Sequence, residues 1–264
     1  MSATAVIPAR YASTRFPGKA LADRTGKPLI QHVVEQVRKA QLIDRVIVAT
    51  DDQRIYDAAV GFGCEAMLTR PDHPNGTSRI AEVVANLSAS TPQASSPKPQ
   101  ASDIIVNVQG DEPEIDPRVI DQLVHGLEAD GDAPMATLAS DFADDEDPAD
   151  PNIVKLVTYR VEGRCRALYF SRSLIPHHRD HPQSAIRNPQ YLKHPGLYAY
   201  RRRFLVKYVT LAPSPLELAE QLEQLRALEH GYPIAVVKTE VRHHGIDTPQ
   251  QYEQFVHRYR NQHS

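Results

Sequence analysis

The feature that most constrains the fold is the order of three segments at the start of the chain. Residues 5–7 form a short apolar run that ends at Pro8, a pattern typical of a buried strand. Residues 28–37 then show apolar positions at helical spacing. The loop between them carries three cations: Arg10, Arg15 and Lys19. Because ligands of open α/β sheets bind beyond the carboxyl ends of the strands, the loop lies where a ligand is expected.

Three cations on one loop suit a triphosphate, since arginine offers a planar fork of donors and lysine a point charge. Taken alone, such a stretch is more often a solvated basic loop. Gly18 lies in the same loop.

The rest of the chain repeats the alternation of strands and helices. Strands are predicted at 46–49, 65–68, 103–108, 154–157, 166–170 and 234–237. Helices are predicted at 28–37, 56–60, 80–87, 117–127, 204–208 and 214–231, the last with a buried stripe of Leu218, Leu222, Leu225 and Leu228. Residues 88–102 are rich in Ser and Pro and predict a surface loop, to which we assign no function.

Composition excludes several functional classes. With 264 residues, 41% hydrophobic and 24% charged, the chain has the balance of a soluble α/β protein. A net charge of −3 offers no general attraction to nucleic acid or to membrane surfaces. Cys64 and Cys165 lack metal-ligand spacing, and neither a signal peptide nor an apolar run of about 20 residues is found. We therefore expect a cytoplasmic protein.

Residues 70–79, RPDHPNGTSR, precede the predicted helix 80–87. Thr77 or Ser78 is a suitable cap for that helix. The segment is either a plain connection or a nucleotide-recognition loop, in which Gly76 allows close backbone approach and Arg79 reaches a base or phosphate.

Two acidic positions are candidate metal ligands. Asp111 follows the apolar strand 103–108, where bound phosphates and a hard cation such as Mg²⁺ would lie, although Gly-Asp is also a common turn pair. The neighbouring Glu112 is less suited to the same ion, because adjacent side chains of an extended segment point apart. Asp247 precedes Thr-Pro and could equally be a helix cap.

The second half of the chain offers weaker candidates. The acidic run 141–150 is best explained as a solvated loop, and a transition-metal site at His177, His178 and His181 is the less favoured interpretation. His194 and Tyr198 suit a polyhydroxylated ligand or, alternatively, plain strand packing. Glu223 could be an ordinary exposed acid.

The ordered blocks IPARYASTRFPGK, VATDD, RPDHPNGTSR, VNVQGDEPEI, ALYFSR, HPGLYAYR, SPLELAEQLEQLRALE and GIDTP resemble the sugar-acid cytidylyltransferases. The resemblance implies an α/β, Rossmann-like nucleotide-diphospho-sugar transferase fold with a mixed, mostly parallel sheet. It implies a single domain over residues 1–264, with a nucleotide-binding core at about 1–150 and 230–264. The region at about 151–229 would be a smaller subdomain for sugar binding and dimerisation.

The resemblance also implies an activity. CMP would pass from CTP to 3-deoxy-manno-octulosonate (Kdo) with release of pyrophosphate, for lipopolysaccharide biosynthesis, in a Mg²⁺-dependent homodimer. Within the family, the QGDEP and LEQLRALE blocks favour the eight-carbon Kdo over the nine-carbon sialic acids.

Roles follow from the same resemblance, residue by residue. The catalytic set is Lys19, Arg10, Arg15, Asp111 and Asp247, of which Asp111 and Asp247 would hold Mg²⁺. CTP would contact Pro8, Arg10, Arg15, Lys19, Gly76, Thr77, Arg79 and Gln109. The sugar acid would contact Arg172, His194, Tyr198, Glu223 and Gln224. Pro195 departs from the family pattern and removes a backbone donor, which puts the placing of His194 in doubt.

Two other classes compete with this interpretation. A dinucleotide-dependent oxidoreductase would carry G-x-G-x-x-G after its first strand, where this chain has the Arg/Lys loop. A non-catalytic nucleotide- or sugar-binding homologue would lack Lys19, Asp111 or Asp247, and all three are present.

Overall fold

A computed structural model describes residues 2–13, 15–89, 103–177, 179, 191–241 and 245–263. The chain divides into two compact units, residues 1–121 with 243–264 (unit 1) and residues 122–242 (unit 2). We predicted a nucleotide-binding core and a sugar-binding subdomain with boundaries at about residues 150 and 230. That division concerns which part binds which ligand, and it stays a prediction. Most of the predicted loop 88–102, together with His178 and His181, lies outside the described residues.

Unit 1 is a parallel sheet in the order β4-β1-β2-β3. Its strands are β1 (Ala3–Ala9), β2 (Ile43–Thr50), β3 (Glu65–Leu68) and β4 (Ile104–Asn107). Its helices are the short 3-10 turn η1 (Lys19–Leu21), α1 (Leu29–Val37), α2 (Gln53–Gly61), α3 (Gly76–Ala89) and α8 (Pro249–His263). Helix α4 (Pro117–Ala129) crosses the boundary between the two units.

The predicted end of the first strand at Pro8 is wrong, because β1 continues to Ala9. Its neighbour β4 pairs only with residues 3–6 of β1, whereas β2 pairs along the whole strand. Pro8 therefore lies where β1 has a strand partner on one side, a position in which a residue without an N–H is tolerated.

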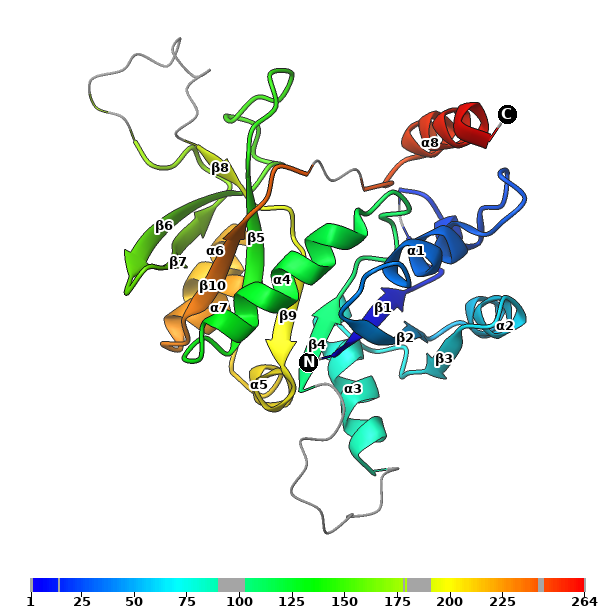
Figure 1. Cartoon of the computed structure of the whole chain (residues 1–264), viewed down its shortest axis with the longest axis horizontal. Helices are drawn as coiled ribbons and strands as arrows, with labels where there is room; N and C mark the ends of the chain where they lie inside the picture. The colour runs from blue at the N-terminus through cyan, green and yellow to red at the C-terminus, as the bar shows by residue number, and fades with distance from the viewer. Residues whose placement is uncertain are drawn as a thin grey trace. The chain divides into compact units, whose positions relative to one another are not determined.

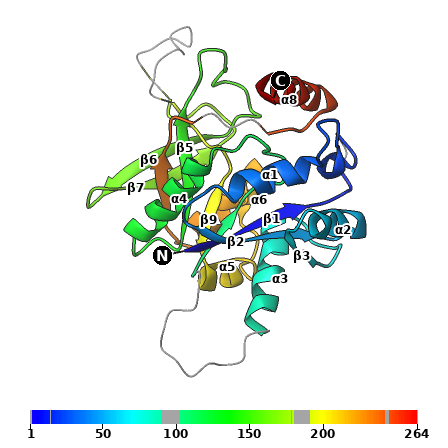
Figure 2. The same cartoon turned by 45° about the vertical axis from the view of Figure 1, so that its right-hand side comes forward.

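Helices cover both sides of the unit 1 sheet. Figures 1 and 2 show α1 and α3 on opposite sides of its strands. The predicted apolar face of α1 is confirmed, since its core-facing side chains are fully buried: Leu29, Ile30, Val33, Val34 and Val37. Burial of this face, rather than helix propensity alone, stabilises so short a helix.

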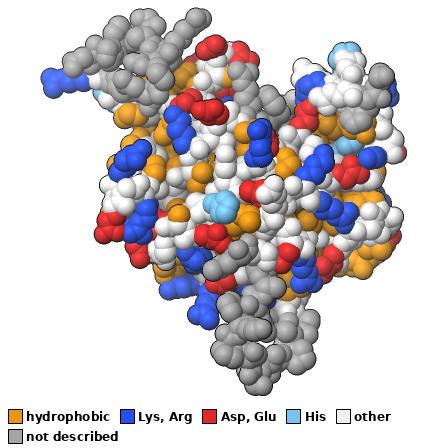
Figure 3. Space-filling view, in the orientation of Figure 1, with side chains coloured by type: hydrophobic (Ala, Val, Ile, Leu, Met, Phe, Trp, Pro, Cys, Tyr) orange, Lys and Arg blue, Asp and Glu red, His pale blue; other side chains and the backbone are white. Residues whose placement is uncertain are grey.

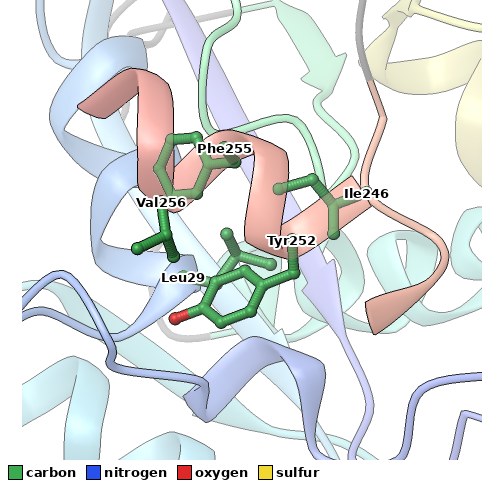
Figure 4. Close-up of a cluster of buried hydrophobic side chains, with 5 residues drawn as sticks. All are labelled: Leu29, Ile246, Tyr252, Phe255 and Val256. Carbon is green, nitrogen blue, oxygen red and sulfur yellow. The ribbon is translucent and has the colours of Figure 1, made fainter. Parts of the chain in front are cut away.

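The C-terminal helix α8 packs against α1. Tyr252, Phe255 and Val256 of α8, with Ile246 just before it, surround Leu29 in a buried cluster (Figure 4). This packing joins the last part of the chain to the first within unit 1.

Unit 2 is built differently. Its strands are β5 (Met135–Asp141), β6 (Lys155–Val161), β7 (Arg164–Ser171), β8 (Leu192–Lys193), β9 (Tyr198–Arg201) and β10 (Ile234–Lys238). Strand pairs β5–β10, β10–β7, β7–β6, β6–β8 and β8–β5 form a closed ring, and β9 also pairs with β5. The helices are α5 (Arg202–Tyr208), α6 (Pro215–Glu220) and α7 (Gln224–Glu229).

The predicted mostly parallel sheet is wrong, since the strands are parallel in unit 1 but mixed in unit 2. Among the strand pairs described within unit 2, β5–β10 alone is parallel. Strands β6 and β7 are joined by only Glu162 and Gly163, both with positive φ. Such a two-residue connection forces antiparallel pairing.

The predicted single helix over residues 214–231 is also wrong. Gln221 adopts a left-handed conformation with φ 53°, which ends α6 and separates it from α7. Leu222 and Leu225 are buried as expected, but Leu218 is 59% exposed. Because the segment is broken at Gln221, a single apolar stripe does not run along both α6 and α7.

Charged side chains of both signs are interspersed on the face shown in Figure 3. This mixture agrees with the small net charge of −3. Within the described parts of the chain, no helix is long and apolar enough to cross a membrane.

We predict that Gly126→Ala destabilises the protein. A Cβ at Gly126 of α4 would lie 2.1 Å from Cγ2 of Val237 in β10. Overpacking of this kind costs about 1–3 kcal/mol, against roughly 1 kcal/mol gained in helix propensity, so we expect a net loss of up to about 2 kcal/mol. Chemical denaturation measures the change.

The matched control is Gly131→Ala, because a Cβ there meets no atom within 4 Å. Gly126→Ala should cost little in a Val237→Ala background. An equal loss in both backgrounds would refute the steric explanation.

Candidate functional site

The predicted catalytic residues of unit 1 meet around the Lys19 ammonium group. Its Nζ lies 2.6 Å from Oδ2 of Asp111, 3.2 Å from Oδ1 of Asp247 and 2.9 Å from the carbonyl oxygen of Ile246. The Lys19 side chain is only 16% exposed. Residues 92 and 228 positions apart along the chain therefore form one charged cluster.

Local structure holds each member of this cluster. Lys19 starts η1 directly after Gly18, whose φ of 71° suits glycine. Asp111 lies in the turn after β4, and its carbonyl oxygen accepts a hydrogen bond of 2.8 Å from the backbone N–H of Ile246. Asp247 precedes α8, and the side-chain oxygen of Gln251 accepts from its backbone N–H.

The other two loop cations are more exposed. Arg15 places Nη2 3.0 Å from Oδ1 of Asp247 and is 65% exposed. Arg10 lies exposed directly after β1 and makes no ion pair with the described residues. Both guanidinium groups are thus accessible to a ligand from solvent.

A stacked contact supports the basic loop. The Arg54 guanidinium lies 3.4 Å from the ring centroid of Tyr11. The same ring would be 3.1 Å from a Cβ at Gly18. Arg54 is held in turn by Asp52, which caps α2. The VATDD block therefore fixes the loop that carries Lys19.

Three segments approach closely around Pro8. A Cβ at Gly110 would lie 2.8 Å from the Pro8 carbonyl oxygen, and a Cβ at Gly76 would lie 3.2 Å from the Pro8 ring. Glycine is therefore required by contact at Gly110 and favoured at Gly76. Of the predicted CTP residues, Pro8 and Gly76 are thus brought together, and the partly buried Gln109 is next to Gly110.

Arg79 does not extend into solvent. Its side chain is 5% exposed and forms an ion pair of 3.2 Å with Oδ2 of Asp51, and it also donates to Thr69. Thr77, at the start of the same helix, is buried as well. In the structure the Arg79 side chain joins α3 to the residues that follow β2 and β3. Its predicted contact with a base or phosphate stays a prediction.

In unit 2, His194 is a neutral hydrogen-bonding group. Its Nε2 lies 2.9 Å from Oγ1 of Thr137, and that hydroxyl donates its single proton to the carbonyl oxygen of Leu197. His194 must therefore donate from Nε2, which leaves Nδ1 as an acceptor. Burial lowers the pKa of His194 to about 3, and its ring contacts Phe170 and Tyr198.

Pro195 does not disturb this arrangement. It lies in the four-residue connection between β8 and β9, where no ladder hydrogen bond is lost. His194 itself is fastened by its backbone N–H, which donates to the carbonyl oxygen of Val154 at 2.9 Å. The doubt that Pro195 raised about the placing of His194 is thus removed.

Gln224 offers a buried donor to a ligand. It is 4% exposed, and its Nε2 has no hydrogen-bond partner among the described residues. An unpaired buried amide costs free energy unless a ligand or water satisfies it. The adjacent Glu223 is held by its backbone, whose carbonyl oxygen accepts from the Tyr208 hydroxyl at 2.6 Å.

Arg172 is committed to protein contacts. Its Nε and Nη1 donate to the carbonyl oxygens of Glu220 and Pro151, at 2.8 and 3.0 Å. The carboxylate of Glu220 accepts from the Arg172 backbone N–H at 2.9 Å. The carbonyl oxygen of Arg172 accepts from the buried ammonium of Lys155. A contact with the sugar carboxylate would require Arg172 to give up some of these bonds, and that role stays a prediction.

Sequence reasoning missed several members of these clusters. Thr137 lies in β5, a strand that its small side chains concealed, so the group that orients His194 was not identified. Asp51 was visible as an acid at a strand end, although its pairing with Arg79 was not. The carbonyl oxygen of Ile246 could not have been found, since any residue supplies one.

We predict that His194→Gln makes the protein less sensitive to mild acid. The native pKa of His194 is about 3, whereas an unfolded histidine titrates near about 6.5. Below about pH 6.5 the unfolded state binds a proton that the native state excludes. The free energy of unfolding therefore decreases as the pH is lowered. The unfolding free energy of the wild type should therefore drop more than that of the variant between about pH 7 and pH 5.

His125→Gln is the matched control, because that ring is 67% exposed on α4. Chemical denaturation at each pH gives the slopes. Equal slopes for the wild type and His194→Gln would contradict a neutral buried His194.

Comparisons with known proteins identify the family of the chain. The family profile described as Cytidylyltransferase matches residues 4–239. A 3-deoxy-manno-octulosonate cytidylyltransferase of Geobacter metallireducens is 49% identical over 97% of each chain. Another with that name, from Pelobacter propionicus, is 51% identical over 94% of each chain.

Among solved structures, CMP:2-keto-3-deoxy-manno-octonic acid synthetase complexed with CTP is similar, with a TM-score of 0.84 and 42% identity. The match covers 99% of this chain and 100% of the other. The profile match spans most of the sequence, and the relatives align over nearly their whole length. This chain therefore belongs to the cytidylyltransferase family.

Proposed function

We propose that this protein transfers CMP from CTP to Kdo and releases pyrophosphate, and that the CMP-Kdo formed serves lipopolysaccharide biosynthesis. The names of relatives that are 49% and 51% identical over nearly the whole chain support the substrates. The reaction joins the α-phosphorus of CTP to the anomeric oxygen of Kdo and breaks the bond between the α- and β-phosphates.

The observation that carries the proposal is the meeting of Lys19, Asp111 and Asp247. Distant segments place two carboxylates within 3.2 Å of one ammonium group, and the lysine that bears it is only slightly exposed. A purely structural ion pair needs one acid, whereas phosphoryl transfer needs both cations for the triphosphate and acids for a metal.

The chain's own residues would act mainly by positioning and by charge. Arg10, Arg15 and Lys19 would bind the triphosphate and stabilise the charge that develops on the leaving pyrophosphate. Little covalent chemistry is asked of the protein, so orientation of the two substrates should supply much of the acceleration.

The oxygens of this cluster fit Mg²⁺. Two carboxylates and the carbonyl oxygen of Ile246 already surround a positive charge, and hard cations take oxygen ligands of this kind. No third Asp, Glu, His or Cys completes a metal-binding group in the described parts of the chain. Asp111 and Asp247 would hold the ion together with substrate phosphates. When bound, it would neutralise phosphate charge and lower the pKa of the attacking hydroxyl.

Unit 2 offers groups suited to a sugar acid. The unpaired Nε2 of Gln224 is a donor, and Nδ1 of His194 is an acceptor. Tyr198 contacts the His194 ring, and burial raises its pKa, so its hydroxyl stays protonated. Neutral groups of this kind pair with hydroxyls without the cost of burying a charge.

Pyrophosphate release tests the proposal, with CTP, UTP, ATP and GTP each combined with Kdo and with N-acetylneuraminate in the presence of Mg²⁺. We expect release only with CTP and Kdo. Asp111→Asn should lower kcat/KM by about a hundredfold or more, the order seen when an electrostatic stabiliser is removed. Asp57→Asn makes the same change on the exposed side of α2 and should be harmless.

Other outcomes would redirect the proposal. Release with the nine-carbon acid would keep the mechanism and change the sugar. A folded protein that binds CTP and releases no pyrophosphate with any pair would instead be a non-catalytic homologue.

The homodimer and the cytoplasmic location stay predictions. Exposed apolar side chains in unit 2 support self-association: Tyr159, Leu168, Leu216 and Leu218. A register shift leaves Leu168 of β7 without a partner on β6, and it is 60% exposed. We predict a dimer by light scattering and a shift toward monomer in Leu168→Asp. A wild-type monomer would contradict the dimer.

A further inference from the structure

The cluster at Lys19 is electrically complete without a ligand. Asp111 and Asp247 contribute two negative charges, and among the described residues Lys19 and Arg15 are the cations in contact with them. The shortest of these contacts, 2.6 Å, joins Lys19 to Asp111. The carboxylates proposed to hold a metal are therefore already neutralised by the residues proposed to hold the triphosphate.

A divalent ion and the Lys19 ammonium compete for this position. Mg²⁺ binds oxygen at about 2.0–2.1 Å, close to where Nζ now approaches the same carboxylates. The two cations also repel each other, and the repulsion is only partly screened because the lysine is largely buried. Lys19 takes one oxygen of each acid, Oδ2 of Asp111 and Oδ1 of Asp247, so a divalent ion that uses those two oxygens requires the ammonium to leave them.

In this cluster the two cations are more free to move than the two acids. Asp247 is fixed by α8, which packs on Leu29 through Tyr252 and Phe255. Asp111 is fixed through the backbone hydrogen bond to Ile246. Lys19 reaches them on a flexible four-carbon stem, so rotation about its side-chain bonds is enough to remove the ammonium.

We infer that Lys19 is an exchangeable counter-ion that keeps the metal site closed until a nucleotide arrives. The inference rests on the proposed function, because it is the triphosphate that draws Lys19 and Arg15 away from the acids. Once these two cations bind phosphate, Asp111 and Asp247 are left unneutralised and accept the divalent ion. Nucleotide and metal then bind with positive cooperativity, and each raises the affinity for the other by the same factor.

The test measures metal binding to the free protein. Mn²⁺ serves as the probe and is titrated without nucleotide, with free Mn²⁺ followed by electron paramagnetic resonance. Lys19→Met removes the charge and keeps much of the side-chain volume. We expect Lys19→Met to bind Mn²⁺ on the order of tenfold or more tightly than the wild type, because one close positive charge is gone.

Three further measurements sharpen the result. Lys27→Met is the matched control, since Lys27 pairs with Glu35 and not with the cluster, and it should leave Mn²⁺ affinity unchanged. Arg15→Met should give a smaller increase, because Arg15 contacts only Asp247 and is more exposed. A non-hydrolysable CTP analogue should tighten Mn²⁺ binding to the wild type and much less so in Lys19→Met.

Folding is checked in the same samples. Without a divalent ion Lys19→Met should melt at a lower temperature than the wild type, since two acids have lost their main partner. Mg²⁺ alone should recover most of that loss in the variant and should stabilise the wild type far less. Equal Mn²⁺ affinities of a folded Lys19→Met and the wild type would overturn the inference.

Failure of this inference is distinguishable from failure of the proposed function. Mn²⁺ binding to the free protein needs no turnover, and pyrophosphate release needs no tighter metal binding in a variant. A wild type that is active with CTP and Kdo, and binds Mn²⁺ equally well with and without the analogue, would keep the function and reject the counter-ion role.

Discussion

The packing of α8 on α1 is the contact on which the charged cluster of unit 1 depends. Each large apolar side chain that it buries contributes about 1.5–3 kcal/mol, and Tyr252, Phe255 and Val256 are all nearly fully buried. Through this contact the segment that bears Ile246 and Asp247 is held beside the loop that bears Lys19. Hydrophobic burial at one end of the sheet thus positions a carboxylate for chemistry.

Charge in the cluster is arranged for exchange rather than for maximum stability. The exposed pair of Arg15 with Asp247 contributes little to folding, whereas the largely buried Lys19 is replaced by the divalent ion when it leaves the acids. The contact of Lys19 with two acids keeps those acids together before any ligand arrives. The frame that holds them is apolar, while the counter-ion is on a flexible four-carbon side chain. A fixed pair of acids with a movable counter-ion suits a site that binds a nucleotide and a divalent ion together.

In unit 2, by contrast with the charged cluster of unit 1, the candidate binding groups are buried and neutral. His194 is fixed in one tautomer by Thr137, and its pKa of about 3 keeps it uncharged near neutral pH. Gln224 adds a buried amide with an unpaired donor. Such groups distinguish hydroxyl positions by direction, because a neutral hydrogen bond depends more on geometry than a charge–charge contact does.

Much of this molecule was predictable from local pattern. The apolar periodicity indicated α1 and the parallel strands of unit 1, and the ordered blocks indicated the family. Other features needed the folded chain. The break at Gln221, the strand β5 and the bonds of Arg172 depend on contacts with segments distant in the sequence.

The sequence by itself determined which residue types lie at strand ends and loops, because period and turn chemistry are local. Only the tertiary structure decided which cation meets which acid, because that pairing is set by packing between segments more than two hundred residues apart.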